Sequence, residues 1–230
     1  MEASVPLTLE QVARAGYREV EFAGYFGVKP AQLRRWLDGA GLTAPSAQVP
    51  LQDGELGPIF DAGAELGHRY LVLASPSAEQ RRSIEDFRGV AAFLNRAGEE
   101  ARKRHLSIAY HNHDFEFTDI GGMVPYDVLL SETDPDLVSM EVDLYWMAKA
   151  GRDPLRYFGA HSGRFRLCHL KDIDSNGNVA DVGSGRLDFA QILRQRRKAG
   201  LRHFFVEHDQ PANPLQSIRT SYHYLSTLAV

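Results

Sequence analysis

The sequence has little of several features that define particular classes of protein. Its single cysteine, Cys168, excludes an internal disulfide, fits a reducing compartment and lies in an apolar run typical of a buried thiol. No apolar stretch reaches the roughly 18 residues that a membrane helix needs, and no signal peptide opens the chain. Basic residues, 26 against 30 acidic ones, are too few to favour a nucleic-acid partner. A cytoplasmic protein with neither a membrane nor a nucleic-acid partner is the default expectation.

The chain also lacks any composition break or long linker. Its 230 residues are 43% hydrophobic and 24% charged, which is ordinary usage for a globular protein. A chain of this length can bury one large core. We therefore expect a single domain over residues 1–230.

Short apolar, β-rich runs alternate with stretches of helical periodicity. The expected strands are Arg18–Phe22, Ser46–Val49, Tyr70–Ala74, Ser107–His111, Leu137–Asp143, Phe165–Leu170 and His203–Glu207. Strands that are separated by helices in this way must be mostly parallel. The pattern therefore leaves a parallel barrel or a doubly wound sheet.

Helix start signals support the alternation. Thr8, Asp188 and Asn213 are candidate N-caps, and Pro30 suits the first turn of a helix. The helix expected after Ser77 is the longest, and it places on one face Ile84, Phe87, Val90, Ala91, Leu94, Ala97 and Ala101.

The positions of the polar residues favour the barrel. They cluster at the C-terminal ends of the last four strands, which converge on one mouth in a (β/α)8 barrel, and no G-x-G-x-x-G follows the first strand. We therefore predict an α/β fold of the TIM type in which seven strands are visible. Residues 1–7 are too few for the missing first strand, so either the barrel is incomplete or the natural chain starts earlier. An incomplete barrel would expose two edges, through which a homo-oligomer can form.

One residue from each of the last four strands can contribute to a metal site at this mouth: His111, Asp143, His169 and Glu207. The intervals between them each match about one strand–helix–strand unit, so their side chains should lie next to one another. Two imidazoles and two carboxylates suit divalent Mn, Zn, Fe or Co, with Mg also open. The alternative for each residue is a structural role, as a hydrogen-bonded His or a capping carboxylate.

Other candidates lie near these four. His113 and Glu116 can orient a substrate or transfer a proton. Glu21 points toward the mouth if strand alternation holds, where it can contact substrate or a basic neighbour. Lys171 can polarise a substrate carbonyl, or it forms a salt bridge with a neighbouring carboxylate. Trp146 can form an apolar wall for a sugar face, or it packs under a loop.

A short glycine-rich segment, Gly183-Ser184-Gly185, precedes the last but one helix. Barrels often bind phosphate at this position, but three residues of turn chemistry are a weak signal and a plain loop is the favoured interpretation.

The chain resembles the xylose isomerase-like TIM-barrel superfamily, the sugar phosphate isomerase/epimerase group. The resemblance covers nearly the whole chain and rests on the ordered segments AGYREVEFAGYFG, AYHNHDFEF, EVDLYWMAKAGRDP, CHLKD, VGSGRLDF and FFVEHD. Members hold a divalent metal on Glu, Asp, His and Glu, and the last three carry over to Asp143, His169 and Glu207. His111 stands where the first Glu is expected, as in a "YHNH" subgroup, and Gln48 stands where relatives often carry His. Relatives usually begin with a strand before the first helix, and some carry an export signal there, so a periplasmic location also stays open.

The resemblance implies a metal-dependent enzyme that acts on a sugar or a keto-sugar. Isomerisation or epimerisation would begin with removal of a proton next to a carbonyl, with Glu207 or Glu116 as the base and Lys171 stabilising the developing oxyanion. Loss of a leaving group would instead make the enzyme a lyase or dehydratase of the 3-keto-glycoside or inosose type. A non-catalytic, truncated barrel is a further alternative. An endonuclease IV-like activity would need more metal ligands and a basic groove.

Overall fold

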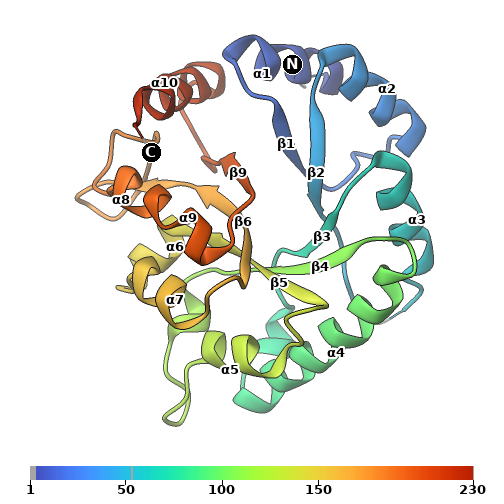
Figure 1. Ribbon diagram of the computed structural model, residues 1–230, viewed down its shortest axis with the longest axis vertical. Coiled ribbons are helices and arrows are strands. Elements are labelled where there is room, and N and C mark those ends of the chain that lie inside the picture. The colour runs from blue at the N-terminus through green and yellow to red at the C-terminus, as the bar shows by residue number, and fades with distance from the viewer. Residues whose placement is uncertain (1–3, 53, 230) are drawn as a thin grey trace.

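The computed structural model describes residues 4–52 and 54–229, in which seven parallel strands form one curved sheet covered by helices (Figure 1). The sheet order is β1-β2-β3-β4-β5-β6-β9, so every strand expected from the sequence is present. The architecture is a nearly closed, TIM-like α/β barrel. The strand bounds are β1 Glu19–Ala23, β2 Thr43–Gln48, β3 Tyr70–Leu73, β4 Ser107–His111, β5 Val138–Asp143, β6 Phe165–Leu170 and β9 His203–Val206.

Helices follow the strands and pack on the outer face of the sheet (Figure 1). They are α1 Val5–Ala15, α2 Pro30–Ala40, α3 Gly57–Leu66, α4 Ile84–Arg102, α5 Pro125–Glu132, α6 Leu144–Lys149, α7 Pro154–Ala160, α8 Phe189–Arg194, α9 Arg196–Ala199 and α10 Pro214–Thr227. Two 3-10 turns, η1 Ala78–Arg81 and η2 Phe115–Phe117, and a short antiparallel pair, β7 Asp172–Ile173 with β8 Val179–Ala180, complete the described elements. None of the described helices is long and apolar enough to cross a bilayer.

Most of the expected helix starts are confirmed. Pro30 opens α2, the Asp188 side chain accepts from the Gln191 N–H, and the Asn213 side chain accepts from the Gln216 N–H. The expected cap Thr8 is wrong by a few residues, and the longest helix begins at Ile84, several residues beyond Ser77.

Thr8 lies inside α1, which already begins at Val5 with a proline in its first turn. Ser77 precedes the 3-10 turn η1, and α4 begins after Ser83, whose hydroxyl accepts from the Asp86 N–H. The expected apolar face of α4 is buried at all seven positions.

Buried residues form two clusters because alternate strand positions face opposite sides of the sheet. The larger cluster lies between the sheet and the helices. The smaller one lines the inside of the barrel and consists of Tyr70, Val72, Ala109, Leu167 and Phe205. Three of the expected metal ligands lie on the same interior face. His111, His169 and Glu207 each follow a member of this cluster, Ala109, Leu167 and Phe205, by two residues. The apolar interior therefore ends at the polar mouth.

Strands β1 and β9 form the two ends of the sheet, and we call the junction between them the seam. Side chains bridge it: the Glu19 carboxylate lies 2.9 Å from His203 Nδ1, and the Tyr17 hydroxyl donates to the Ile218 carbonyl at 2.8 Å. A cavity of about 240 Å³ extends along the seam to His169 and Glu207. Helices α1 and α10 lie next to each other over this side of the barrel (Figure 1).

Candidate metal centre

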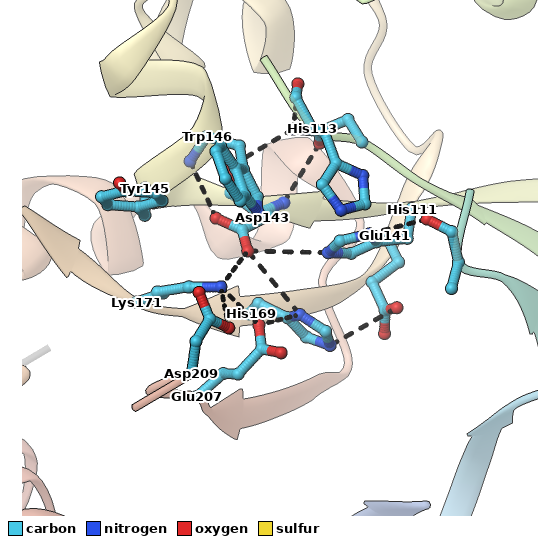
Figure 2. Close-up of polar contacts among 12 residues, drawn as sticks. His111, His113, Glu141, Asp143, Tyr145, Trp146, His169, Lys171, Glu207 and Asp209 are labelled. Carbon is cyan, nitrogen blue, oxygen red and sulfur yellow. Dashed lines mark hydrogen bonds and ion pairs between the residues drawn. The ribbon is translucent and has the colours of Figure 1, made fainter. Parts of the chain in front are cut away.

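The four expected ligands come together at the C-terminal ends of β4, β5, β6 and β9. One ligand atom of each residue lies within 4.8 Å of the others, and His111, Asp143 and His169 are buried. The sheet register explains this convergence, because Asp143 is paired with His169 across β5 and β6. His111 precedes them by one strand and Glu207 follows by one (Figure 2).

His111 is oriented by a hydrogen bond on one side of its ring. Its Nδ1 lies 3.1 Å from the carbonyl oxygen of Ala74, so this nitrogen carries the proton and donates it. The other nitrogen, Nε2, is buried and has no hydrogen-bond partner among the described residues, and it lies 3.5 Å from Asp143 Oδ2. The imidazole therefore turns Nε2 toward Asp143.

His169 is oriented in the same way, with its two nitrogens exchanged. Its Nε2 lies 2.8 Å from Glu21 Oε2 and donates to this carboxylate. Its Nδ1 faces the mouth, 2.8 Å from Glu207 Oε2 and 3.8 Å from Asp143 Oδ2. A ring held by a carboxylate on one nitrogen is the usual arrangement of a metal-binding histidine.

The two carboxylate oxygens of Asp143 have different surroundings. Oδ1 accepts from the Trp146 N–H at 2.9 Å and so caps α6. Oδ2 is buried and has no hydrogen-bond partner within the described chain. The Asn112 amide fixes the backbone here, because its Oδ1 accepts from the Asp143 N–H and its Nδ2 donates to the Asp143 carbonyl. The cap and the amide together aim Oδ2 at the two imidazoles.

Lys171 supplies the positive charge of the mouth. Its ammonium lies 2.7 Å from Asp209 Oδ1, 3.3 Å from Glu207 Oε2 and 3.7 Å from Asp143 Oδ2 (Figure 2). The side chain is buried beside the rings of Tyr145 and Trp146. The salt bridge that was the alternative role expected for Lys171 is therefore present. The same ammonium also lies next to two of the candidate metal ligands.

Opposite charges in the cluster stabilise the ionised forms of one another's side chains. Burial disfavours the charged forms of His111 and His169, but the facing carboxylates outweigh it and raise both pKa values. Burial likewise opposes the ionised form of Glu207, yet His169 and Lys171 lower its pKa to about 2. The pKa of Lys171 is raised because Asp143 and Glu207 outweigh the effect of its burial. At neutral pH Glu207 is therefore a carboxylate and Lys171 an ammonium.

His113 and Trp146 form an aromatic wall beside the ligands. The His113 ring is 5.1 Å from Trp146 and stacks on Phe115 at 5.5 Å. Burial, with the nearby His111, lowers the pKa of His113 to about 4, so its ring is neutral at neutral pH. Both side chains are only partly buried, which leaves this wall accessible to a ligand.

Glu116 lies just beyond His113, as expected, but its side chain is buried instead of facing a substrate. It sits in the turn η2, is fully buried, and accepts from the Tyr110 hydroxyl at 2.7 Å and from the His113 N–H at 2.8 Å. Burial raises its pKa to about 7. With both oxygens engaged, Glu116 does not fit direct contact with a substrate. It positions His113 instead.

Two further carboxylates lie on the interior side of His169. Glu21 holds its Nε2, and this is the basic neighbour that strand alternation left open. Glu141, which the sequence reasoning did not select, is fully buried with Oε2 3.4 Å from the same nitrogen. Burial and the neighbouring Glu21 raise the pKa of Glu141 to about 7. Glu141 precedes Asp143 by two residues, so strand alternation places both side chains on the same face of the sheet. This pattern could have identified Glu141 from the sequence.

The glycine-rich segment surrounds an internal carboxylate. Asp172 is fully buried and accepts from the backbone N–H groups of Ile173, Gly183, Gly185 and Leu187 at 2.8–3.1 Å. A Cβ at Gly185 would collide with Asp172 Oδ1. The loop therefore uses its N–H groups within the chain, which supports the plain-loop interpretation over a phosphate site.

The donor set fits a divalent metal ion. Three buried atoms that face one another, His111 Nε2, Asp143 Oδ2 and His169 Nδ1, have no hydrogen-bond partner among the described residues. Their polar neighbours are one another, Glu207 and Lys171, at ion-pair distances of 2.8–3.8 Å. A cation placed among them would bind all three atoms at once. The second polar atom of each side chain is engaged elsewhere, as in built metal sites.

Residues 9–228 match the family described as xylose isomerase-like TIM barrel. The chain belongs to this family. It is 25% identical to an inosose dehydratase of Lacticaseibacillus casei over 97% of this chain and 89% of that protein. A sugar phosphate isomerase/epimerase from Parabacteroides distasonis superposes with a TM-score of 0.83 at 27% identity, covering 96% of this chain and 87% of that one. A 3-keto-D-glucoside 4-epimerase from E. coli has the same fold, with a TM-score of 0.74 at 18% identity, covering 96% and 94% of the two chains.

Membership places the chain among sugar-related enzymes of the isomerase, epimerase and dehydratase types. The buried His, Asp and Glu cluster at its mouth is consistent with a metal site of this family.

Proposed function

We propose that this chain is a divalent-metal-dependent enzyme that removes a proton next to a carbonyl of a sugar or keto-sugar and returns it to give an isomer or epimer. The convergence at the mouth of three buried ligand atoms that lack hydrogen-bond partners among the described residues carries the proposal. A divalent ion held by His111, Asp143, His169 and Glu207 would polarise the substrate carbonyl and lower the barrier to removing the adjacent proton. Mn, Zn, Fe, Co and Mg all remain candidates for this ion.

Glu207 is the carboxylate best placed to act as the base. Its side chain is 35% exposed, whereas those of the other three ligands are almost completely buried. Its low pKa keeps it ionised, and Lys171 at 3.3 Å holds Oε2, which leaves Oε1 for the substrate. Glu207 would therefore serve both the ion and the proton transfer.

Lys171 would stabilise negative charge that develops on the substrate oxygen. Its raised pKa keeps it an ammonium, which suits an electrostatic role better than that of a base. One face of a sugar ring would lie against Trp146 and His113, where the aromatic surface is accessible. Glu21 and Glu116 act on this site indirectly, by holding His169 and His113.

Elimination of water is the second candidate reaction. The similarity to an inosose dehydratase over nearly the whole chain favours it. The same proton removal would begin the reaction, and the Lys171 ammonium would donate a proton to the departing hydroxyl. Incubation with keto-sugars and inososes in D2O separates the candidates, because isomerisation or epimerisation puts deuterium into a product of unchanged composition, whereas elimination yields a product that has lost water.

Metal content is the first test of the proposal. We expect near-stoichiometric Mn, Zn, Fe, Co or Mg in the parent chain and its loss in an Asp143→Ala, His169→Ala double variant, measured by elemental analysis. Asp143 also caps a helix, so Asp188→Ala, which removes a cap of the same kind from α8, is the matched control and should keep the metal. A parent chain that takes up no metal even after reloading would refute this mechanism.

A further inference from the structure

Glu141 occupies an unusual position on the interior face of β5. It is fully buried, and neither of its carboxylate oxygens has a hydrogen-bond partner among the described residues. Figure 2 shows the His169 ring between Asp143 on one side and Glu141 on the other. Glu141 therefore lies deeper in the barrel than the mouth cluster.

Glu21 faces the same space from β1. Its Oε2 accepts from His169 Nε2 at 2.8 Å, while its Oε1 is buried with no hydrogen-bond partner in the described chain. Ligand atoms of Glu21, Glu141 and His169 lie within 4.8 Å of one another. Ser46, fully buried, is opposite Glu21 in the sheet register and adds a hydroxyl to this level of the barrel.

The surroundings offer these carboxylates little compensation. The interior apolar cluster that includes Val72 and Ala109 lies on the inner side. Gln48 donates to Glu21 Oε2 at 3.3 Å, but it is neutral. Lys171 is engaged with Asp209, Glu207 and Asp143, and the ion-pair partner recorded for Glu141 among the described residues is His169 alone.

Binding of an ion at the mouth makes this imbalance larger. A histidine that ligates a metal through Nδ1 is neutral, so His169 then gives Glu21 and Glu141 one N–H group but no charge. Five carboxyl groups, on Glu21, Glu141, Asp143, Glu207 and Asp209, would share the positive charge of Lys171 and one divalent ion. Buried carboxylates in excess of cations are costly unless a proton or another cation neutralises them.

We propose that Glu21 and Glu141 bind a second cation inside the barrel, with His169 standing between it and the metal at the mouth. The available ligand atoms are both Glu141 oxygens and Glu21 Oε1, with the Ser46 hydroxyl nearby. Oxygen ligands select a hard cation such as Mg²⁺, Mn²⁺ or Ca²⁺. The inner ion keeps Glu21 ionised and in place, so that it continues to orient the His169 ring.

The number of bound Mn²⁺ ions tests this site directly. Chelator-treated protein is titrated with Mn²⁺ and its metal content is measured after gel filtration. We expect the parent to bind one ion more per chain than Glu141→Gln, whereas Asp143→Asn weakens the mouth site and keeps the inner ion. Glu116→Gln is the matched control, since this carboxyl is equally buried but hydrogen-bonded, and it should bind as many ions as the parent.

Equal Mn²⁺ binding by the parent and a folded Glu141→Gln variant would overturn the proposal. A carboxylic-acid band in the infrared spectrum of the Mn²⁺-loaded parent, absent from Glu141→Gln, would overturn it too, because Glu141 would then be neutralised by a proton. If circular dichroism shows that Glu141→Gln does not fold, Glu21→Gln replaces it, with the same loss of one ion expected at Mn²⁺ concentrations that saturate the weakened mouth site. Loss of an ion in Glu141→Gln but no change at all in Asp143→Asn would refute the mouth site and leave the inner one standing.

Discussion

The two halves of the barrel wall contribute differently to the site. Strands β4, β5, β6 and β9 present the candidate metal-ligating side chains, whereas β1 and β3 present the groups that orient them. Each ligating imidazole contacts both halves: His111 faces Asp143 and the Ala74 carbonyl after β3, and His169 faces Glu207 and Glu21 on β1. One half thus supplies the ligand atoms and the other fixes which ring nitrogen is free.

Removing a ligand from the binding half should have the largest effect. Asp143→Asn keeps Oδ1 as the helix cap but replaces the free carboxylate oxygen by an amide group. We expect divalent-metal affinity to fall by more than the roughly 10- to 100-fold that loss of an orienting partner costs. Mn²⁺ titration measures it, and unchanged affinity at the mouth would remove Asp143 from the ligand set.

Acid should act on the same half. Although burial opposes it, the facing carboxylates raise the pKa values of His111 and His169, so a metal must displace protons that are bound more tightly than usual. Below these pKa values, affinity should fall about tenfold per pH unit for each proton displaced, and it should level off above them. Calorimetry in two buffers of different ionisation enthalpy counts the released protons, and no release at neutral pH would contradict the expectation.

Disturbing the orienting half should cost less. Glu21→Gln weakens the acceptor that holds His169 Nε2, and we expect metal affinity at the mouth to fall roughly 10- to 100-fold. Glu19→Gln is the matched control, because Glu19 lies two residues earlier on the same strand but contacts His203. Equal losses in the two variants would point to a general disturbance of β1 instead of loss of the orienting bond.

The seam contact itself should contribute least. The Glu19 and His203 side chains are 36% and 18% exposed, so their pairing is partly screened by solvent. We expect Glu19→Gln to lower the free energy of unfolding by less than about 1 kcal/mol. Urea denaturation measures this change, and a much larger loss would show that the side-chain bridge, not the packing of α1 and α10, holds β1 to β9.

Much of the binding half was predictable from the sequence. Buried parallel strands appear as apolar runs, and a period of two identifies which residues share a face. Because strand ends of a barrel converge, the spacing of His111, Asp143, His169 and Glu207 was enough to place them together. Asp188 and Asn213 could be recognised as caps because a cap depends on a few neighbouring residues.

The orienting half was much harder to predict. The partner of Glu21 is 148 residues away across the seam, and no local pattern specifies such a pair. The turn η2 buries Glu116 instead of exposing it, which depends on the Tyr110 hydroxyl beneath. The role of Asp172 likewise appears only when the loop that contains Gly183 and Gly185 has folded around it. Contacts that close over long stretches of chain require the structure.

The position of the site at the seam links ion binding to the stability of the whole sheet. Glu207 follows β9 and Glu21 lies on β1, so His169 connects the two ends of an otherwise continuous ladder. Any ion that binds only the folded chain adds to its stability, by about 2.7 kcal/mol at a hundred times its dissociation constant. In this chain the ion would stabilise the contact between β1 and β9, which no backbone hydrogen bonds of the described sheet join. A chelator should therefore accelerate hydrogen exchange most at the backbone amides of these two strands.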